Sequence, residues 1–420
     1  MAGRKLRIGL LGCGTVGRGL VELVTKNDAL IRQRTGVALA ITRILVRDLE
    51  KTRPGVDRAL LTDQPEKVLN NGCDLVVELV GGIEPARSFI QRSLHQGKHV
   101  VTANKALLAL DGLSLMKTAE ARKLRLGFEG SVCGGIPIIR ALRNGLVGNH
   151  IQSISGILNG TCNYILTRMT EDRTDFADAL QEAQAKGFAE ADPTLDVDGH
   201  DAAQKLKILA ELAFNTRISC DAVPAQGIRE ITADDVQAAF ELGYVIKHVA
   251  TAEMIAGRLS LQAAPMLLPT GHQLAAVREE NNAVLVRGDA VGEMLFSGKG
   301  AGSLPSASAV LSDVLDIACH KGGFSINPAE DVGQAGAPGG KHYLRFVVRE
   351  PSAIGPITAI LERNGAAVAR AAAVWSRNGE TRHQVRILTH SVPASGITAS
   401  LQSIVEQGYS DRCLVLRVAG

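Results

Sequence analysis

The feature that most constrains this chain is a glycine-rich turn, Gly12-x-Gly14-x-x-Gly17. It follows the apolar run Arg7–Leu11, which predicts a strand, and opens a helical pattern that continues to about Arg34. Between a strand and a helix, the first glycine permits a tight turn and the second lets the backbone approach a pyrophosphate. The third allows close helix packing, and the anion lies at the helix N-terminus. This context predicts dinucleotide binding; a glycine-rich turn that binds nothing is the alternative.

Pattern changes along the chain predict three domains with an α/β fold. Residues 1–135 alternate short strands with amphipathic helices, which is typical of a Rossmann-type domain with a parallel sheet. Residues 136–330 indicate an α+β domain, including one long helix over Asp234–Ala256. A glycine-rich linker at 333–340 precedes residues 341–420, whose order β-α-β-β-α-β predicts a small, separate ferredoxin-like domain.

Composition excludes several classes of protein. The chain has 420 residues, 46 Lys plus Arg against 43 Asp plus Glu, and 3% aromatic residues. This balance argues against nucleic-acid and membrane-surface proteins, and no apolar stretch reaches the ~20 residues of a spanning helix. The seven cysteines include no CxxC pair, so we expect neither a disulfide framework nor structural zinc, and a cytoplasmic location.

Two strand ends carry further candidates for the cofactor site. At the end of the second expected strand, Arg47 favours a 2′-phosphate and therefore NADP, while the adjacent Asp48 leaves NAD possible. Thr102 and Lys105 follow a later strand, where ligands of open parallel sheets bind. Lys105 there could orient a substrate carboxylate or assist proton movement; a solvated lysine is the alternative.

The most informative segment is an acidic stretch that ends in a lysine. Its charged residues are Glu190, Asp192, Asp196, Asp198, Asp201 and Lys205. Asp201 and Lys205 share one face of an expected helix, and we expect the other carboxylates to converge on them from an irregular loop. Such a cluster could hold a substrate ammonium group and keep the lysine charged and ready to pass a proton. An N-capped helix with an ion pair is the alternative.

This segment strongly resembles the signature of the homoserine dehydrogenase family. The matching residues are Ala183, Gly187, Phe188, Ala189, Asp192, Pro193, Asp196, Val197, Gly199, Asp201 and Lys205. The runs Gly156–Leu166, Thr102–Lys105 and Gly300–Gly302 are similar to further family motifs. The resemblance extends from the first strand to about residue 320, and the C-terminal domain is similar to regulatory ACT domains.

The resemblance implies that residues 136–330 form a catalytic and dimerisation domain, and it implies a role for each matching position. Lys205 would donate the proton in aldehyde reduction, with Lys105 as a second basic group, and Glu190, Asp201 and Asp196 would form the homoserine site. The implied cofactor contacts are Gly12, Gly14, Thr15, Val16, Gly17, Arg47, Thr102, Lys105, Gly187, Glu190 and Gly302. A structural sodium ion would be held by Glu129 and the backbone carbonyls of Val132, Gly134 and Ile136.

The expected activity is therefore the reversible NAD(P)H-dependent reduction of L-aspartate 4-semialdehyde to L-homoserine. We expect a homodimer or homotetramer, with threonine as an inhibitor that binds the ACT-like domain, so that deletion after about residue 340 would remove inhibition and spare activity. Another reductase of amino-acid metabolism with the same first domain is one alternative. A ligand sensor without chemistry is the other, although no helix-turn-helix is visible.

Overall fold

The computed structural model describes residues 4–70, 72–219, 221–319, 332–375 and 383–419. The chain divides into two compact units. The first comprises Met1–Ile154, Gln204–Val223 and Asn281–Val332, and the second comprises Ser155–Ala203, Pro224–Glu280 and Gly333–Gly420. Strand β7 (Ile151–Ile157) and helix α10 (His200–Ala213) run through boundaries between them. Within the described ranges, every helix is too short or too polar to cross a membrane.

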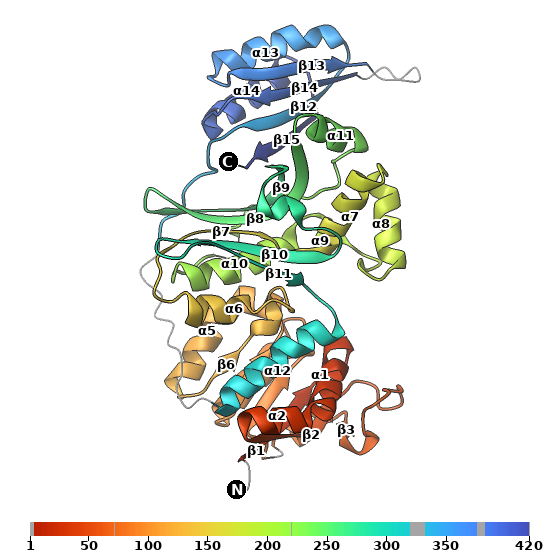
Figure 1. The fold of residues 1–420 in the computed structure, drawn as a ribbon, viewed down its shortest axis with the longest axis vertical. Helices are drawn as coiled ribbons and strands as arrows, with labels where there is room; N and C mark the ends of the chain where they lie inside the picture. Colours follow the sequence, from red (N-terminus) through yellow and green to blue (C-terminus); the bar gives the residue numbers. More distant parts are fainter. Residues whose placement is uncertain (1–3, 71, 220, 320–331, 376–382, 420) are drawn as a thin grey trace. The chain divides into compact units, whose positions relative to one another are not determined.

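The first unit contains a parallel sheet with the strand order β3-β2-β1-β4-β5-β6 (Figure 1). Its strands are β1 (Arg4–Leu11), β2 (Val37–Leu45), β3 (Leu61–Thr62), β4 (Leu75–Glu78), β5 (His99–Thr102) and β6 (Leu126–Gly127). The order reverses beside β1, as in doubly wound dinucleotide-binding folds, whose ligands bind at the carboxyl ends of the strands next to this reversal. The predicted Rossmann-type fold is confirmed.

Helices cover both faces of this sheet. They are α1 (Thr15–Lys26), α2 (Asp28–Thr35), α3 (Pro65–Leu69), α4 (Ala86–His95), α5 (Lys105–Ala121) and, from far along the chain, α12 (Ser303–Cys319). Helix α12 contributes Val310 and Val314 to the same core as Leu10 and Leu20, and all four side chains are buried. The sheet therefore depends on a helix that the sequence pattern assigned to the region after residue 136. The same unit includes α6 (Ile138–Arg140) and the hairpin β10 (Asn281–Gly288) and β11 (Gly292–Lys299).

The second unit is built on strands in the order β8-β9-β15-β12-β14-β13. They are β8 (Tyr244–Ile255), β9 (Arg258–Pro269), β12 (His342–Val348), β13 (Val368–Val374), β14 (His383–Thr389) and β15 (Cys413–Val418). Its helices are α7 (Gly160–Glu171), α8 (Phe176–Ala185), α9 (Thr194–Val197), α11 (Ala233–Glu241), α13 (Ile354–Arg363) and α14 (Ala394–Glu406). From β12 to β15 the order is β-α-β-β-α-β with antiparallel pairing, which confirms the ferredoxin-like prediction (Figure 1).

Two helix predictions are wrong. The expected helix over Asp234–Ala256 is helix α11 followed by strand β8, and Gly243, at φ +84°, separates them. The residues after this glycine pair with β9 along the whole strand, so long-range pairing decides their structure. The first expected helix begins at Thr15, earlier than predicted. It is divided into α1 and α2, because the backbone of Asn27 is not helical.

The C-terminal βαββαβ segment is less separate than its sequence suggests. Strand β15 pairs with β9 in parallel, at Arg417 with Met266 and at Val418 with Leu267. Side chains alternate along the strands, so that Leu416 joins the core with α7 and α11 while Leu344 packs towards α13 and α14. Removing residues after 340 would open the first of these cores, so the truncation is not a clean test of inhibition.

The buried position of Leu416 gives a stability prediction. We expect Leu416→Ala to lower the free energy of unfolding by about 2–5 kcal/mol, because the truncation leaves a cavity in the core that β15 shares with α7. Val405→Ala on α14 is the control, since the valine is 56% exposed. Thermal and denaturant unfolding measure both variants; an unfolding midpoint of Leu416→Ala equal to that of the control would contradict the shared core.

Candidate active site

The glycine turn after β1 has the geometry that phosphate binding requires. Gly12 has φ +98°, and a Cβ there would lie 2.5 Å from the carbonyl oxygen of Leu79. A Cβ on Gly17 would lie 2.4 Å from the carbonyl oxygen of Gly12, so the helix can approach the turn only without a side chain. Gly14 caps α1, with no heavy atom within 4 Å of its Cβ position and no acidic residue in the first turn. The positive end of α1 therefore suits an anion.

Helix α12 brings Gly302 beside this turn. The hydroxyl of Ser303, the first residue of α12, donates to the carbonyl of Thr15 at 2.8 Å. A Cβ on Gly19 would lie 2.8 Å from the carbonyl oxygen of Ser303, so α1 and α12 are in close contact. Two motifs that lie 288 residues apart in the sequence thus meet in one place.

The loops after β4 and β5 are tied together by the buried carboxylate of Glu78. One oxygen accepts the backbone N–H groups of Val80 and Gly81 at 2.7 and 3.1 Å, and the other accepts the hydroxyl of Thr102 at 2.6 Å. Asn104 adds a second link, because its side-chain amide donates to the carbonyl of Gly82 at 2.6 Å. These contacts fix both loops at the carboxyl edge of the sheet, with Asn104 as the N-cap of α5.

Helix α5 begins with Lys105, which is half-buried. It directly follows the N-cap residue Asn104, whose side-chain oxygen accepts the N–H of Leu107 at 3.2 Å. The lysine therefore stands at the strand end predicted for it.

At the end of β2, Arg47 and Asp48 differ in their surroundings. A carboxylate oxygen of Asp48 accepts the backbone N–H groups of Glu50 and Lys51 at 2.8 and 3.1 Å, so that oxygen closes its own turn. Arg47 is exposed. The acidic side chain is engaged locally, and the cation faces solvent.

In the second unit, the side chain of Asn159 joins two aspartates. Its amide nitrogen donates to Asp196 at 2.7 Å and to Asp201 at 2.8 Å. Its oxygen accepts the backbone N–H of Cys162 at 2.8 Å, which makes Asn159 the N-cap of α7. Asp201 is 3% exposed. Two of the carboxylates predicted to converge do so, and the residue that brings them together begins a helix forty residues earlier in the chain.

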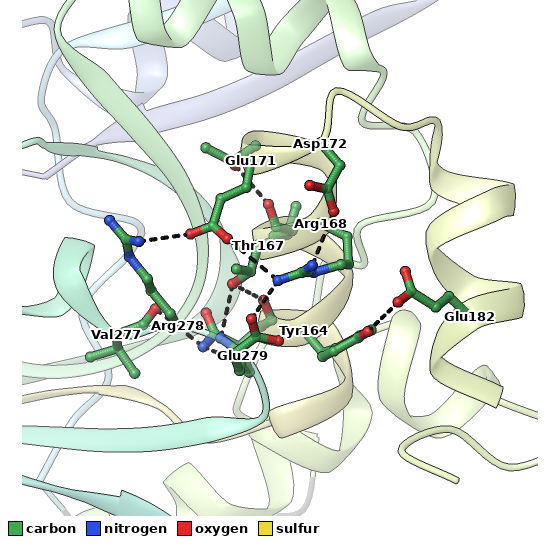
Figure 2. A network of polar contacts seen from close by, with 12 residues as sticks. Tyr164, Thr167, Arg168, Glu171, Asp172, Glu182, Val277, Arg278 and Glu279 are labelled. Atoms are coloured by element: carbon green, nitrogen blue, oxygen red, sulfur yellow. Dashed lines mark hydrogen bonds and ion pairs between the residues drawn. The ribbon is translucent and has the colours of Figure 1, made fainter. Parts of the chain in front are cut away.

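Helix α7 also holds the segment 186–188, which precedes the acidic stretch. The hydroxyl of Thr161 donates to the carbonyl of Phe188 at 2.7 Å, and the rings of Tyr164 and Phe188 lie 4.9 Å apart. The Tyr164 hydroxyl accepts from Lys186 at 2.7 Å and donates to Glu182 at 2.9 Å. Figure 2 shows Tyr164 directed towards Glu182.

The opposite side of α7 is fixed through Arg168. Its guanidinium group pairs with Asp172, Glu171 and Glu279, and the Thr167 hydroxyl accepts the backbone N–H of Glu279 at 3.2 Å (Figure 2). The helix is thereby anchored to the loop before β10 as well as to α8.

Asp192 and Asp198 bond to other partners, contrary to the predicted convergence. Asp198 pairs with Arg229 at 2.5 Å, and Asp192 accepts the backbone N–H of Thr194 at 3.1 Å. Hydrogen bonds from Thr194 lower the pKa of Asp192. The stretch is also less irregular than expected, because Thr194–Val197 forms α9. Glu190 is exposed.

Asp201 and Lys205 stand one turn apart on α10, where Lys205 is 9% exposed. Just before this helix, Gly199 has φ +85°, and a Cβ there would lie 2.9 Å from Nε2 of His248. Burial lowers the pKa of His248 to about 4, so its imidazole is neutral at physiological pH. A buried lysine one helical turn after a buried aspartate is an arrangement that can bind an ammonium group and pass a proton.

The loop predicted to hold sodium surrounds the buried carboxylate of Glu129. Its oxygens accept the backbone N–H groups of Ile139 and Arg140 at 2.9 and 2.8 Å. Burial, and then the nearby Asp313, raise the pKa of Glu129 to about 7. Among the described residues, no group of three or more His, Cys, Asp or Glu side chains could hold a metal, so a site here would depend on backbone carbonyls.

Sequence reasoning missed the roles of Glu78 and Asn159. Glu78 directly follows the apolar run Leu75–Val77, and this position indicated a buried carboxylate that needs hydrogen-bond donors. Asn159 lay inside a recognised motif, and its position before a helix indicated an N-cap but not its aspartate partners.

Comparisons with known proteins all identify the same family. The sequence profile described as "Homoserine dehydrogenase" matches residues 137–315, and "Homoserine dehydrogenase, NAD binding domain" matches residues 12–129. The chain is 35% identical to homoserine dehydrogenase of Bacillus subtilis and 39% identical to that of Neisseria gonorrhoeae, in each case over 96% of this chain and 95% of the relative.

Solved structures extend this similarity to the fold. A homoserine dehydrogenase from Thiobacillus denitrificans aligns with a TM-score of 0.93 at 36% identity, covering 100% of this chain and 99% of that one. A hyperthermophilic archaeal homoserine dehydrogenase mutant in complex with NADPH aligns with a TM-score of 0.64 at 28% identity, covering 75% and 98%.

The Glu78 contacts predict a specific loss of nucleotide binding. We expect Glu78→Ala to weaken NADPH binding about tenfold, because three donors in the β4 and β5 loops lose their acceptor. Fluorescence titration with NADPH measures the effect. The control, Glu84→Ala, removes a half-exposed carboxylate from the neighbouring loop. Equal dissociation constants for the two variants would show that Glu78 does not shape the nucleotide site.

Proposed function

The chain belongs to the homoserine dehydrogenase family, and from this premise we propose how its residues carry out the reaction. The activity is the NAD(P)-dependent interconversion of L-aspartate 4-semialdehyde and L-homoserine, a step of amino-acid biosynthesis. When bound, the nicotinamide supplies the hydride that reduces the C4 aldehyde.

In this proposal Lys205 donates the proton to the oxygen formed at C4, and its charge stabilises that oxygen before the proton moves. Asp201 and Glu190 bind the α-amino group of the substrate, while Asp196 supports Asp201. Lys105 is a second basic group near the reacting carbon. The observation that carries the proposal is the buried Lys205 one helical turn after the buried Asp201.

The cofactor contacts proposed for the first unit begin at the glycine turn. Gly12, Gly14 and Gly17 with Thr15 and Val16 would hold the pyrophosphate at the start of α1, supported by the open space at Gly14. Thr102 and Gly302 are further proposed contacts with the cofactor, as are Gly187 and Glu190.

We favour NADP over NAD as the cofactor. A carboxylate oxygen of Asp48 already closes its own turn, whereas exposed Arg47 can pair with a 2′-phosphate. The proposal distinguishes the two nucleotides only at Arg47, because all other proposed contacts are the same for NADP and NAD.

The sodium site proposed at Glu129, Val132, Gly134 and Ile136 suits the chemistry of that loop. Hard cations prefer carboxylate and carbonyl oxygens. A cation would also stabilise the ionised form of Glu129, which burial and Asp313 disfavour. Its role would be structural.

Regulation and assembly complete the proposal. Threonine would inhibit by binding the ACT-like βαββαβ segment, and the enzyme would form a homodimer or homotetramer in the cytoplasm. The resemblance to ACT domains supports the effector, the edge strands of that segment support pairing between subunits, and the lack of a CxxC pair in the sequence supports a reducing compartment.

Replacement of the proposed acid tests the mechanism. We expect Lys205→Met to lower turnover about a thousandfold or more while NADPH binding stays within about twofold, since the variant keeps the side-chain volume but loses the proton and the charge. Steady-state rates with homoserine and fluorescence titration measure the two effects. Lys117→Met, on the exposed side of α5, is the control. Near-normal turnover of Lys205→Met would assign the proton to another group.

Arg47 is tested by comparing the two nucleotides. We expect Arg47→Ala to raise the KM for NADP about tenfold and to leave the KM for NAD unchanged, because only NADP carries the 2′-phosphate. Assays with both nucleotides on one enzyme preparation provide the control internally. An equal change for both nucleotides would remove Arg47 from 2′-phosphate recognition.

A further inference from the structure

The homoserine site contains an electrostatic conflict that the family signature does not resolve. Asp196 and Asp201 both lie within 2.8 Å of one nitrogen atom, the side-chain amide of Asn159. Two ionised carboxylates at this separation repel each other, and the burial of Asp201 strengthens the repulsion because it reduces screening by water.

The orientation of Asn159 is determined by its surroundings. The side-chain oxygen accepts the N–H of Cys162 at 2.8 Å, so the nitrogen must face the aspartates. An amide nitrogen carries two hydrogens, and ionised carboxylates only accept hydrogen bonds. Each aspartate therefore receives one hydrogen from the same group.

We propose that Asn159 is a positioning residue that holds Asp196 and Asp201 together as an ionised pair and thereby presents Asp201 to the substrate ammonium group. The proposal rests on the proposed roles of Asp201 and Lys205. It differs from them because Asn159, which is 3% exposed, acts through the aspartates.

The charged and titratable groups around this pair come from several elements. Lys205 lies one turn further along α10, and neutral His248 contributes from β8. On α7, the Cys162 thiol donates to the backbone carbonyl of Asp196 and the Thr161 hydroxyl lies 3.2 Å from its carboxylate. Asp198 is paired with Arg229, and Glu190 is exposed. Asn159 donates a hydrogen bond to each of the two carboxylates.

Asn159→Asp separates helix capping from carboxylate pairing. Aspartate caps a helix as well as asparagine does, and its charge suits the N-terminus of α7. The substitution nevertheless replaces the two hydrogens with a third carboxylate. A capping role predicts nearly unchanged kinetics, whereas the pairing role predicts a disrupted substrate site.

We expect Asn159→Asp to raise the KM for homoserine about tenfold or more, with NADPH binding unchanged. Three crowded carboxylates repel one another, and protonation at lower pH removes a charge and restores a donor. The ratio of variant to wild-type kcat/KM should therefore rise as the assay pH falls from neutral to mildly acidic. Asn159→Ser, which caps α7 but supplies one short donor, should raise KM without this recovery.

Asn163→Asp is the matched control on the same helix. Asn163 is buried and donates to the carbonyls of Val277 and Glu279 at 3.3 and 2.9 Å, and it accepts from Lys247 at 3.0 Å. An aspartate there loses both donors to these carbonyls but places its charge beside the Lys247 cation, so this variant measures the general effect of a buried Asn→Asp change in α7. Its KM for homoserine and its pH profile should match those of the wild type.

A wild-type KM for Asn159→Asp, or a kcat/KM ratio that does not change with pH, would overturn the proposal. The same change in Asn163→Asp would also overturn it, because the effect would then belong to the helix. Lys205→Met separates this failure from failure of the site itself: if that variant keeps its turnover, the assigned mechanism is wrong whatever Asn159 does.

Discussion

Buried Asp201 and half-buried Asp196 share one amide group in this protein, and the acidic segment depends on that contact. Asp196 belongs to the short helix α9 and Asp201 to α10, so both helices are fixed relative to the N-terminus of α7. Without a donor between them, two ionised side chains would separate or one would take up a proton. The chemistry expected of Lys205 one turn later requires the ionised arrangement.

Helix α7 positions the acidic segment of the second unit. Its first turn binds Asp196, Asp201 and the Phe188 carbonyl, its middle packs Tyr164 against the Phe188 ring, and its last turns pair Arg168 with surrounding carboxylates. Eight of its twelve residues are buried, including polar ones such as Asn163 and Thr167. A polar helix can be buried only when each group finds a partner, and this requirement makes its position specific.

In the first unit, close backbone contacts and hydrogen bonds fix the loops at the carboxyl ends of the strands. Helix α12 touches α1 at Gly19 and donates a hydrogen bond to Thr15, while Glu78 joins the loops that follow β4 and β5. The glycine turn, the start of α12 and the loop before Lys105 are each anchored by contacts between residues far apart in the chain. Rigid anchoring of such loops lowers the entropy that a bound nucleotide would otherwise have to remove.

The sequence by itself determined the local features of this protein. Short-range sterics set the strand–turn–helix spacing around Gly12, and side-chain alternation sets the period of the C-terminal strands. Both features were predicted from the sequence, and both agree with the structure. Tertiary structure alone decided that Tyr244–Ile255 is a strand, because pairing with β9 overrides its helical pattern. It also decided which acidic residues meet: Asp198 finds Arg229, whereas Asp196 and Asp201 find Asn159. The order of charged residues in the sequence does not predict these partners, because the hydrogen-bond donors come from segments that are distant in the chain.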